Sequence, residues 1–278
     1  MLDSYSDSPG DAPWSLEEIP YHLLDRRQVQ DDSLLFYIVV SASFIEITSD
    51  LYTKNLAAFF HDDPEIVEWL ETGWEPEEMQ HGASLKRYVQ TAWPDFDWEA
   101  AYRDFLVEYA RLCTHERYAD TRSLEMVARC VVETGTSSFY RMLTEFSTEP
   151  VLKELSAKIS SDEVRHYKHF YHYFLRYQER EHQGRAAVFK TLWDRAMEID
   201  DEDAFIAFKH AFLARNPGVE FQRQDYDDYR SGVRRLGKAH FPYDMALKMF
   251  LKPLGLGPAI SRMVLPPAAA ATRLLLLR

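Results

Sequence analysis

The chain has 278 residues, of which 46% are hydrophobic and 14% aromatic, and its formal net charge is −13. This composition is that of a globular protein and excludes a disordered or low-complexity chain. The first residues lack the basic and apolar regions of a secretory signal, and no uncharged apolar run is long enough to span a membrane, so we expect a cytoplasmic location. Two cysteines, Cys113 and Cys130, allow one disulfide at most and exclude a disulfide framework or an iron–sulfur site.

The charge is unevenly distributed along the chain. Between Arg230 and the C-terminus there are nine Lys or Arg residues and one acid, Asp244, which gives this segment a charge of +8. Residues 1–229 therefore carry −21. The first fourteen residues are polar, acidic and contain Pro and Gly, which is typical of a loose arm. The sequence thus predicts an acidic body followed by a basic, partly apolar tail.

The spacing of apolar residues predicts helices along nearly the whole chain, whereas hairpin signals are almost absent. We expect long helices over residues 34–60, 64–93 with a break at Gly73, 97–117, 120–146 and 149–181. Shorter helices are expected over 184–199, 201–215, 223–236 and 242–252. Asp31 and Asp32 are candidate caps of the first helix, and Pro64 suits the first turn of the second. The fold class is therefore all-α.

Acidic and histidine residues lie in the middle of four of these long helices. The first and fourth helices each carry one glutamate within an apolar stretch, and the second and fifth each carry a Glu-x-x-His pair. Glu46 precedes Glu78 by 32 residues, and Glu133 precedes Glu163 by 30 residues, so one pattern is used twice. The candidate metal ligands are Glu46, Glu78, His81, Glu133, Glu163 and His166.

The chemistry of these side chains indicates two metal ions. Residues three apart emerge on the same face of a helix, so the carboxylate and imidazole of each Glu-x-x-His pair converge on one ion. The lone glutamates complete the ring, either bridging the ions or closing the site. Four carboxylates neutralise two divalent cations, which are otherwise costly to bury. This is the ligand set of di-iron carboxylate bundles, which predicts a four-helix bundle with a di-iron centre.

Several neighbouring residues have competing interpretations. Asp50, one turn beyond Glu46, is an alternative ligand on the same helix face. A third Glu-x-x-His pair, Glu179 and His182, lies in a strongly charged stretch, and we assign it to solvent. Thr136, three residues after Glu133, either donates a proton to a bound oxygen species as a catalytic residue or bonds its own backbone. We interpret three further residues near the motifs as packing or surface residues: Cys130, His169 and His172.

The second helix carries a longer motif that resembles the soluble acyl-carrier-protein desaturases. Its pattern is Trp69-x-x-x-x-Trp74-x-x-x-Glu78-x-x-His81-Gly82-x-x-Leu85-x-x-Tyr88. Within it, Glu77-Glu78-Met79-Gln80-His81-Gly82 is similar to that family's Glu-Glu-x-x-His-Gly, with Gln80 in place of an Arg. The fifth helix has Asp162-Glu163-Val164-Arg165-His166, similar to the family's second motif. Thr136 matches a threonine that the family keeps one helical turn beyond the glutamate corresponding to Glu133. The resemblance extends over about residues 30–180.

The resemblance implies a domain organisation and an activity. It implies a ferritin-like di-iron bundle over 31–182. On either side of it we expect an N-terminal arm over 1–30 and, over 183–278, additional helices with a basic tail packed on the bundle, for which the family offers no counterpart. The implied enzyme holds two Fe ions, uses O₂ as co-substrate, and removes two hydrogens from an acyl chain on acyl carrier protein. Electrons would come from a ferredoxin-type donor, since the chain has no flavin or nicotinamide motif.

Other functions and partners remain open at this stage. Relatives with the same six ligands include N-oxygenases and hydroxylases of small or tethered substrates, and ferroxidase or iron storage is the alternative outside the oxygenases. Ribonucleotide reductase small subunits are a further option, but their usual first ligand is Asp. We expect the basic C-terminal region to receive acyl carrier protein, to contact a membrane surface peripherally, or to neutralise the acidic body. A homodimer is open, and no nucleic-acid partner is expected.

Overall fold

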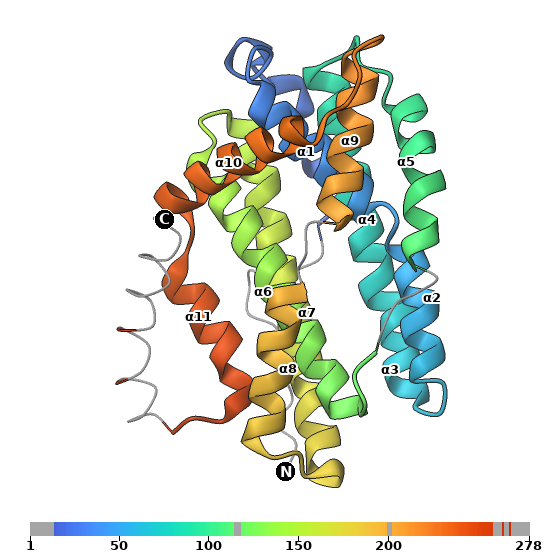
Figure 1. Cartoon of the computed structure of the whole chain (residues 1–278), viewed down its shortest axis with the longest axis vertical. Helices are drawn as coiled ribbons and strands as arrows, with labels where there is room; N and C mark the ends of the chain where they lie inside the picture. The colour runs from blue at the N-terminus through green and yellow to red at the C-terminus, as the bar shows by residue number, and fades with distance from the viewer. Residues whose placement is uncertain (1–13, 114–117, 199–201, 258–262, 264–266, 268–278) are drawn as a thin grey trace.

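The computed structural model describes residues 14–113, 118–198 and 202–257, together with residues 263 and 267. Within this part of the chain every regular element is a helix, and no strand occurs. The predicted all-α class is confirmed. Most of the helices run along one common axis, and α10 crosses them at one end of the molecule (Figure 1).

Eleven α-helices are described. They are α1 Ser33–Glu46, α2 Ser49–Phe59, α3 Pro64–Trp69, α4 Glu75–Ala92, α5 Trp98–Cys113, α6 Arg122–Phe146, α7 Pro150–Glu181, α8 Arg185–Glu198, α9 Glu202–Arg215, α10 Arg223–His240 and α11 Tyr243–Leu251. A π-helical segment, η4 (Leu70–Trp74), joins α3 to α4. Short 3₁₀ turns are η1 Leu16–Glu18, η2 Tyr21–Leu23, η3 Arg26–Gln28 and η5 Lys252–Leu254. The last residues of the predicted 97–117 helix lie outside the described part, whereas the predicted helices from 120 onward are confirmed to within a few residues.

The prediction of one continuous helix over 34–60 is wrong. Asp32 caps α1 as expected, since its side chain accepts from the Leu35 amide, but α1 ends at Glu46. The Thr48 hydroxyl then donates to the Ile45 carbonyl at 2.7 Å, and such side-chain bonds to the backbone compete with helix propagation. The chain resumes as α2 at Ser49. Glu46 therefore stands at a helix end rather than within a helix.

The predicted break at Gly73 is also wrong. The chain passes through the π-helical segment without stopping and continues directly into α4. A π-helical turn adds residues to a helix without ending it, and such turns often occur beside functional sites. This turn places the Trp74 ring edge-on to His166, with ring centroids 6.4 Å apart.

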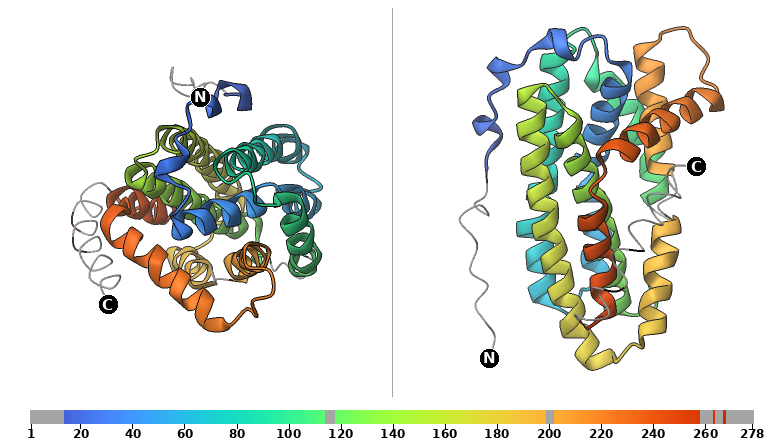
Figure 2. Two further views of the ribbon diagram at one scale, coloured as in Figure 1. Left: turned by 90° about the horizontal axis from the view of Figure 1, so that it is seen from above. Right: turned by 90° about the vertical axis from the view of Figure 1, so that its left-hand side faces the viewer.

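Two helix pairs form the centre of the molecule. The hairpin α6–α7 makes the most extensive helix contact, and α1 packs along α4. The pairs meet where α4 contacts α7, and the view from above shows them side by side (Figure 2). Outside them, α9 packs on α1 and α5, while α8, α10 and α11 pack on α6. Most of the predicted tail beyond residue 257 lies outside the described residues.

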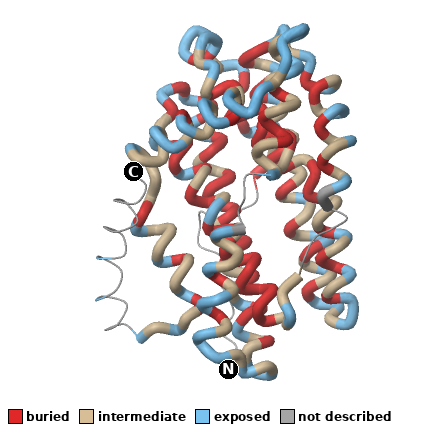
Figure 3. The backbone as a smooth tube through the Cα atoms, in the orientation of Figure 1, coloured by how far each residue is buried: buried red, intermediate tan, exposed pale blue. Residues whose placement is uncertain are grey.

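The interior contains two apolar clusters, and buried residues line the inward faces of the helices (Figure 3). Along η4 and α4, the second cluster ends at Trp74 and the first begins at Leu85. On α7, the first cluster ends at Ile159 and the second begins at Tyr167. Both Glu-x-x-His pairs lie between these limits. The candidate ligands therefore occupy a polar layer between two apolar regions, which is where water is best excluded.

Two further observations differ from the sequence-based expectations. Residues 33–59 are long and apolar enough to cross a membrane, but 67% of the apolar window is buried inside the protein, as in the core helix of a bundle. Trp14, the last residue of the expected loose arm, is 6% exposed. Its indole donates to Asp162 at 2.7 Å, so the arm is attached to α7 at this residue.

Candidate metal centre

The six predicted ligands lie together, and they form two overlapping groups. Glu46 and His81 belong to position A, Glu133 and His166 belong to position B, and Glu78 and Glu163 are shared by both. In each group the donor atoms lie within 4.8 Å of one another, and all six side chains are buried. The shared members are thus the glutamates of the Glu-x-x-His pairs, whereas each lone glutamate belongs to one position.

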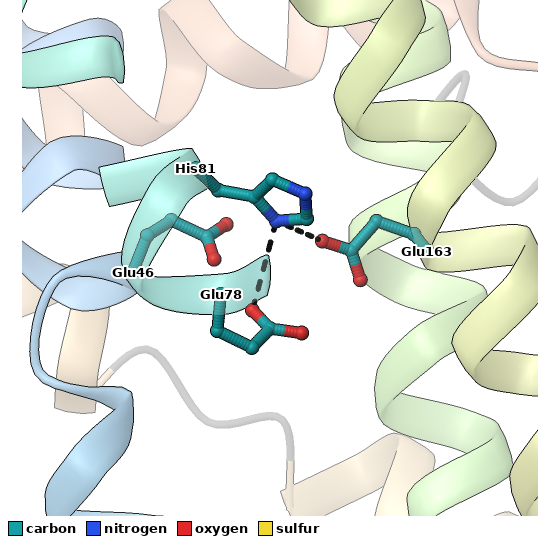
Figure 4. A group of neighbouring side chains, drawn as sticks. All are labelled: Glu46, Glu78, His81 and Glu163. Carbon is teal, nitrogen blue, oxygen red and sulfur yellow. Dashed lines mark ion pairs between the residues drawn. The ribbon is translucent and has the colours of Figure 1, made fainter. Parts of the chain in front are cut away.

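Position A is built from three segments of the chain. Glu46 comes from the end of α1, Glu78 and His81 come from adjacent turns of α4, and Glu163 reaches in from α7 (Figure 4). The His81 Nδ1 atom lies 3.3 Å from Glu163 Oε1 and 3.8 Å from Glu78 Oε2. At position B, the His166 Nδ1 atom lies 2.9 Å from Glu78 Oε1 and 3.8 Å from Glu133 Oε2.

The four carboxylates perturb one another strongly. Burial raises the pKa of Glu46 well above its usual range, and repulsion by Glu78 and Glu163 adds to this. Burial and the same two neighbours likewise raise the pKa of Glu133. For Glu78 burial acts in the same direction, but bonds to His166 and His81 outweigh it and lower its pKa. So many acids at this depth are stable only with protons or cations among them.

Unpartnered buried atoms show that this donor set fits a metal. The Nδ1 atoms of His81 and His166 and the Oε1 atom of Glu163 are buried without a hydrogen bond of acceptable geometry. Buried polar atoms in proteins are nearly always bonded, so such atoms facing one another indicate a bound group. Imidazole nitrogens with carboxylate oxygens suit iron, manganese or zinc rather than the all-oxygen shell of magnesium or calcium.

Each histidine is oriented by an acid on the opposite helix. His81 Nε2 donates to Asp162 at 3.0 Å, and His166 Nε2 donates to Glu77 at 2.7 Å. Since Nε2 of each ring is the donor, Nδ1 is the atom that faces the carboxylates, and it would bind an ion once any proton on it has left. Arg165 joins the two acids, with its Nη atoms 2.8 Å from Glu77 and 2.8 Å from Asp162.

Sequence reasoning missed these supporting residues. Glu77 and Asp162 immediately precede the glutamates of the two Glu-x-x-His pairs, and that repeated acidic doublet was the available signal. Trp14 donates to Asp162 and stacks parallel to His81 at 6.2 Å between ring centroids. Gln80, the departure from the desaturase motif, donates to the Trp14 carbonyl at 2.8 Å. Gln80 therefore attaches Trp14 to α4 beside the site.

Two hydroxyl groups contact the carboxylates. Thr136 Oγ1 donates to Glu163 Oε2 at 2.7 Å, and it also lies 3.3 Å from the carbonyl oxygens of Val132 and Glu133. Both interpretations of Thr136 thus have a structural basis, since it contacts the site and its own backbone. The Tyr140 hydroxyl donates to Glu46 Oε1 and is buried.

The competing residues lie outside the centre. Asp50 pairs with Lys54 at 3.1 Å and is not part of either group, so Glu46 is the acid of this segment that joins the cluster. His182 is exposed and caps the end of α7 with φ of 51°. Cys130 is a free, buried thiol of the second apolar cluster. His169 stacks on Trp69 and His172 is exposed, as expected for packing and surface residues.

Comparisons of the chain with protein-family models, with curated proteins and with solved structures find no match.

Proposed function

We propose that the chain is an O₂-activating, non-haem di-iron oxidoreductase built on a ferritin-like four-helix bundle. The proposed reaction is the desaturation of a fatty acyl chain carried on acyl carrier protein. The observation that supports this most strongly is the pair of buried donor groups, which share Glu78 and Glu163 and have one His Nδ1 each. The desaturase-like motifs on α4 and α7 supply the reaction class.

Each residue of the centre has a distinct part in this proposal. Glu46 and His81 would hold one iron, Glu133 and His166 the other, and Glu78 and Glu163 would bridge them. Bound iron supplies the electron-transfer chemistry that O₂ reduction and C–H cleavage require. The chain itself supplies the geometry, since the outer acids fix both imidazoles before any ion arrives.

The protein also controls protons in this layer. Thr136 is half-buried, and its hydroxyl lies 2.7 Å from the shared Glu163. This hydroxyl can rotate between the Glu163 carboxylate and two backbone carbonyls of its own helix. It can therefore donate its proton toward the centre in one orientation and to the backbone in the other. We assign Thr136 the delivery of a proton to reduced oxygen. The apolar clusters on both sides keep water away from the reacting C–H bond.

The chain requires an external source of electrons, since it has no flavin or nicotinamide motif. A ferredoxin-type protein is the proposed donor. Acyl carrier protein is the proposed second partner, received on the basic face of α10. There, Arg234 and Arg235 are exposed on a helix that packs across α6 and α1.

One experiment tests the proposal. Protein loaded anaerobically with Fe(II) is supplied with a ferredoxin reducing system, O₂ and acyl-carrier-protein thioesters, and the acyl products are analysed by mass spectrometry. Loss of two hydrogens supports desaturation, and a gain of one oxygen indicates the hydroxylase alternative. Turnover of small amines only would indicate an N-oxygenase. Fe(II) oxidation that retains the iron and leaves every substrate unchanged would indicate a ferroxidase or storage protein.

A further inference from the structure

Tyr140 is the buried residue of the centre to which the proposed reaction gives no role. It lies on α6 seven residues after Glu133, so the two side chains share one face of the helix. Its side chain is 1% exposed. From this position it crosses to the end of α1, where its hydroxyl donates to Glu46 Oε1. The bond therefore connects Glu46 of position A to α6, the helix that carries Glu133 of position B.

The two lone glutamates are equivalent in position but not in their contacts. Each lies with one histidine and the two shared glutamates. Glu46 accepts the Tyr140 hydroxyl, whereas no hydroxyl bond to Glu133 occurs within the described residues. Glu46 is also the last residue of α1, whereas Glu133 lies inside α6 and is held by helix on both sides. Glu46 consequently has less backbone restraint, and the phenol is its main fixed contact from outside the donor group.

We infer that Tyr140 is a positioning residue that makes the two metal positions unequal. Because the phenol bonds one oxygen of Glu46, the other oxygen is the one that an ion at position A would bind first. Glu133, without such a donor, is free to bind through either oxygen or both. This inference rests on the proposed two-metal centre but does not depend on desaturation or on any particular substrate.

The chain offers a matched control. Tyr167 follows His166 directly, is 2% exposed, and its hydroxyl donates to the Met249 carbonyl at 2.6 Å. Tyr140→Phe and Tyr167→Phe each remove one buried phenol hydroxyl and its hydrogen bond. Only the first bond ends on a carboxylate of the centre. A general effect of losing a buried hydrogen bond should therefore be alike in both variants.

The test separates the two positions with histidine variants. The His166→Ala background retains position A, and the His81→Ala background retains position B. Each is treated with a chelator and titrated with Co(II), whose absorption spectrum reports its coordination. Tyr140→Phe should weaken Co(II) binding roughly 10–100-fold and change its spectrum in the first background, with no change in the second. Tyr167→Phe should change neither.

Equal Co(II) affinities and spectra with and without Tyr140→Phe at position A would overturn the inference, as would an equal loss at both positions. If Tyr140→Phe does not fold, fluorotyrosine at position 140 keeps the donor and changes its strength, so the position A spectrum should shift while that of position B does not. Failure of otherwise unmodified protein to take up two ions would instead contradict the proposed function.

Discussion

Asp162 and Glu77 each bond a histidine of the opposite helix across the contact between α4 and α7. Asp162 on α7 accepts from His81 of α4, and Glu77 on α4 accepts from His166 of α7. Each acid stands directly before a shared glutamate, so each short motif carries one candidate ligand and one acid that binds the other motif's histidine. The two helices can therefore present their histidines correctly only when they are packed together.

This exchange gives the first prediction. Asp162→Asn and Glu77→Gln should each weaken metal binding by roughly 10–100-fold, because an amide can donate to the imidazole and favour the wrong tautomer. Isothermal titration with Co(II) or Fe(II) measures the change. The matched control is Glu108→Gln, since Glu108 also bonds a histidine, His210 at 2.8 Å, but lies away from the centre. An equal effect of all three substitutions would contradict the assigned role of the outer acids.

A second prediction concerns the close approach of α1 to α4. A Cβ on Gly82 would lie 2.3 Å from the Ile47 backbone nitrogen, directly after Glu46. Gly82→Ala should therefore lower the free energy of unfolding by about 1–3 kcal/mol and move Glu46 from the centre. Urea unfolding and metal titration measure both effects. Gly135→Ala is the control, because nothing lies within 4 Å of its added Cβ, and it should stabilise the helix by roughly 0.5–1 kcal/mol.

The third prediction is a pH dependence of the metal-free protein. Burial alone would lower the pKa of His166, but the hydrogen bond to Glu77 and the nearby Glu78 carboxylate raise it to about 9. A group whose pKa is raised on folding stabilises the fold below its unfolded pKa, which is about 6.5 for His. That stability is lost as the pH rises through 9. Glu46 and Glu133, whose pKa values are also raised, change stability in the same direction.

The melting temperature of chelator-treated protein should accordingly fall between pH 6.5 and 9. Protein loaded with metal should show a smaller fall, because cations replace the protons in the polar layer. Metal uptake should release protons, which a pH indicator dye can count. A metal-free protein that gains stability over this pH range would contradict the charge distribution described here.

The fourth prediction separates three roles of the basic segment. A triple variant should weaken binding of acyl carrier protein at low salt and leave the melting temperature unchanged. Its substitutions are Arg230→Glu, Arg234→Glu and Arg235→Glu. Loss of binding to anionic liposomes alone would indicate a membrane contact instead. A lower melting temperature with unchanged carrier-protein binding would indicate that these residues only neutralise the acidic body. Lys190→Glu on the exposed face of α8 is a control for a single charge reversal outside this segment.

The spacing of the candidate ligands was predictable because it depends on one helix at a time. Glu78 with His81, and Glu163 with His166, share a helix face whatever surrounds them, and the structure brings all four together. Their partners Glu77 and Asp162 were not predictable in that way, since each acts on the opposite helix. Only the packing of α4 on α7 determines that relationship.

The end of α1 and the position of Trp14 were predicted wrongly because both depend on contacts between residues far apart in the sequence. The end of α1 at Glu46 follows from the Thr48 side chain and from the close contact of Ile47 with Gly82, and the second of these joins residues far apart in sequence. Apolar periodicity alone continues through this point, so it predicts one helix. Trp14 was assigned to a loose arm by the polar composition of its neighbours, although its contacts with Asp162 and Gln80 attach it to the centre.

The most direct test of the proposed two-metal centre is the iron content of protein loaded anaerobically with Fe(II) and then desalted. We expect two iron ions per chain in the unmodified protein and in His182→Ala, whose histidine is exposed at the end of α7. We expect one iron in His81→Ala and one in His166→Ala, with O₂ consumption lost in both. Two irons retained in both of these variants, or none in the unmodified protein, would contradict the account.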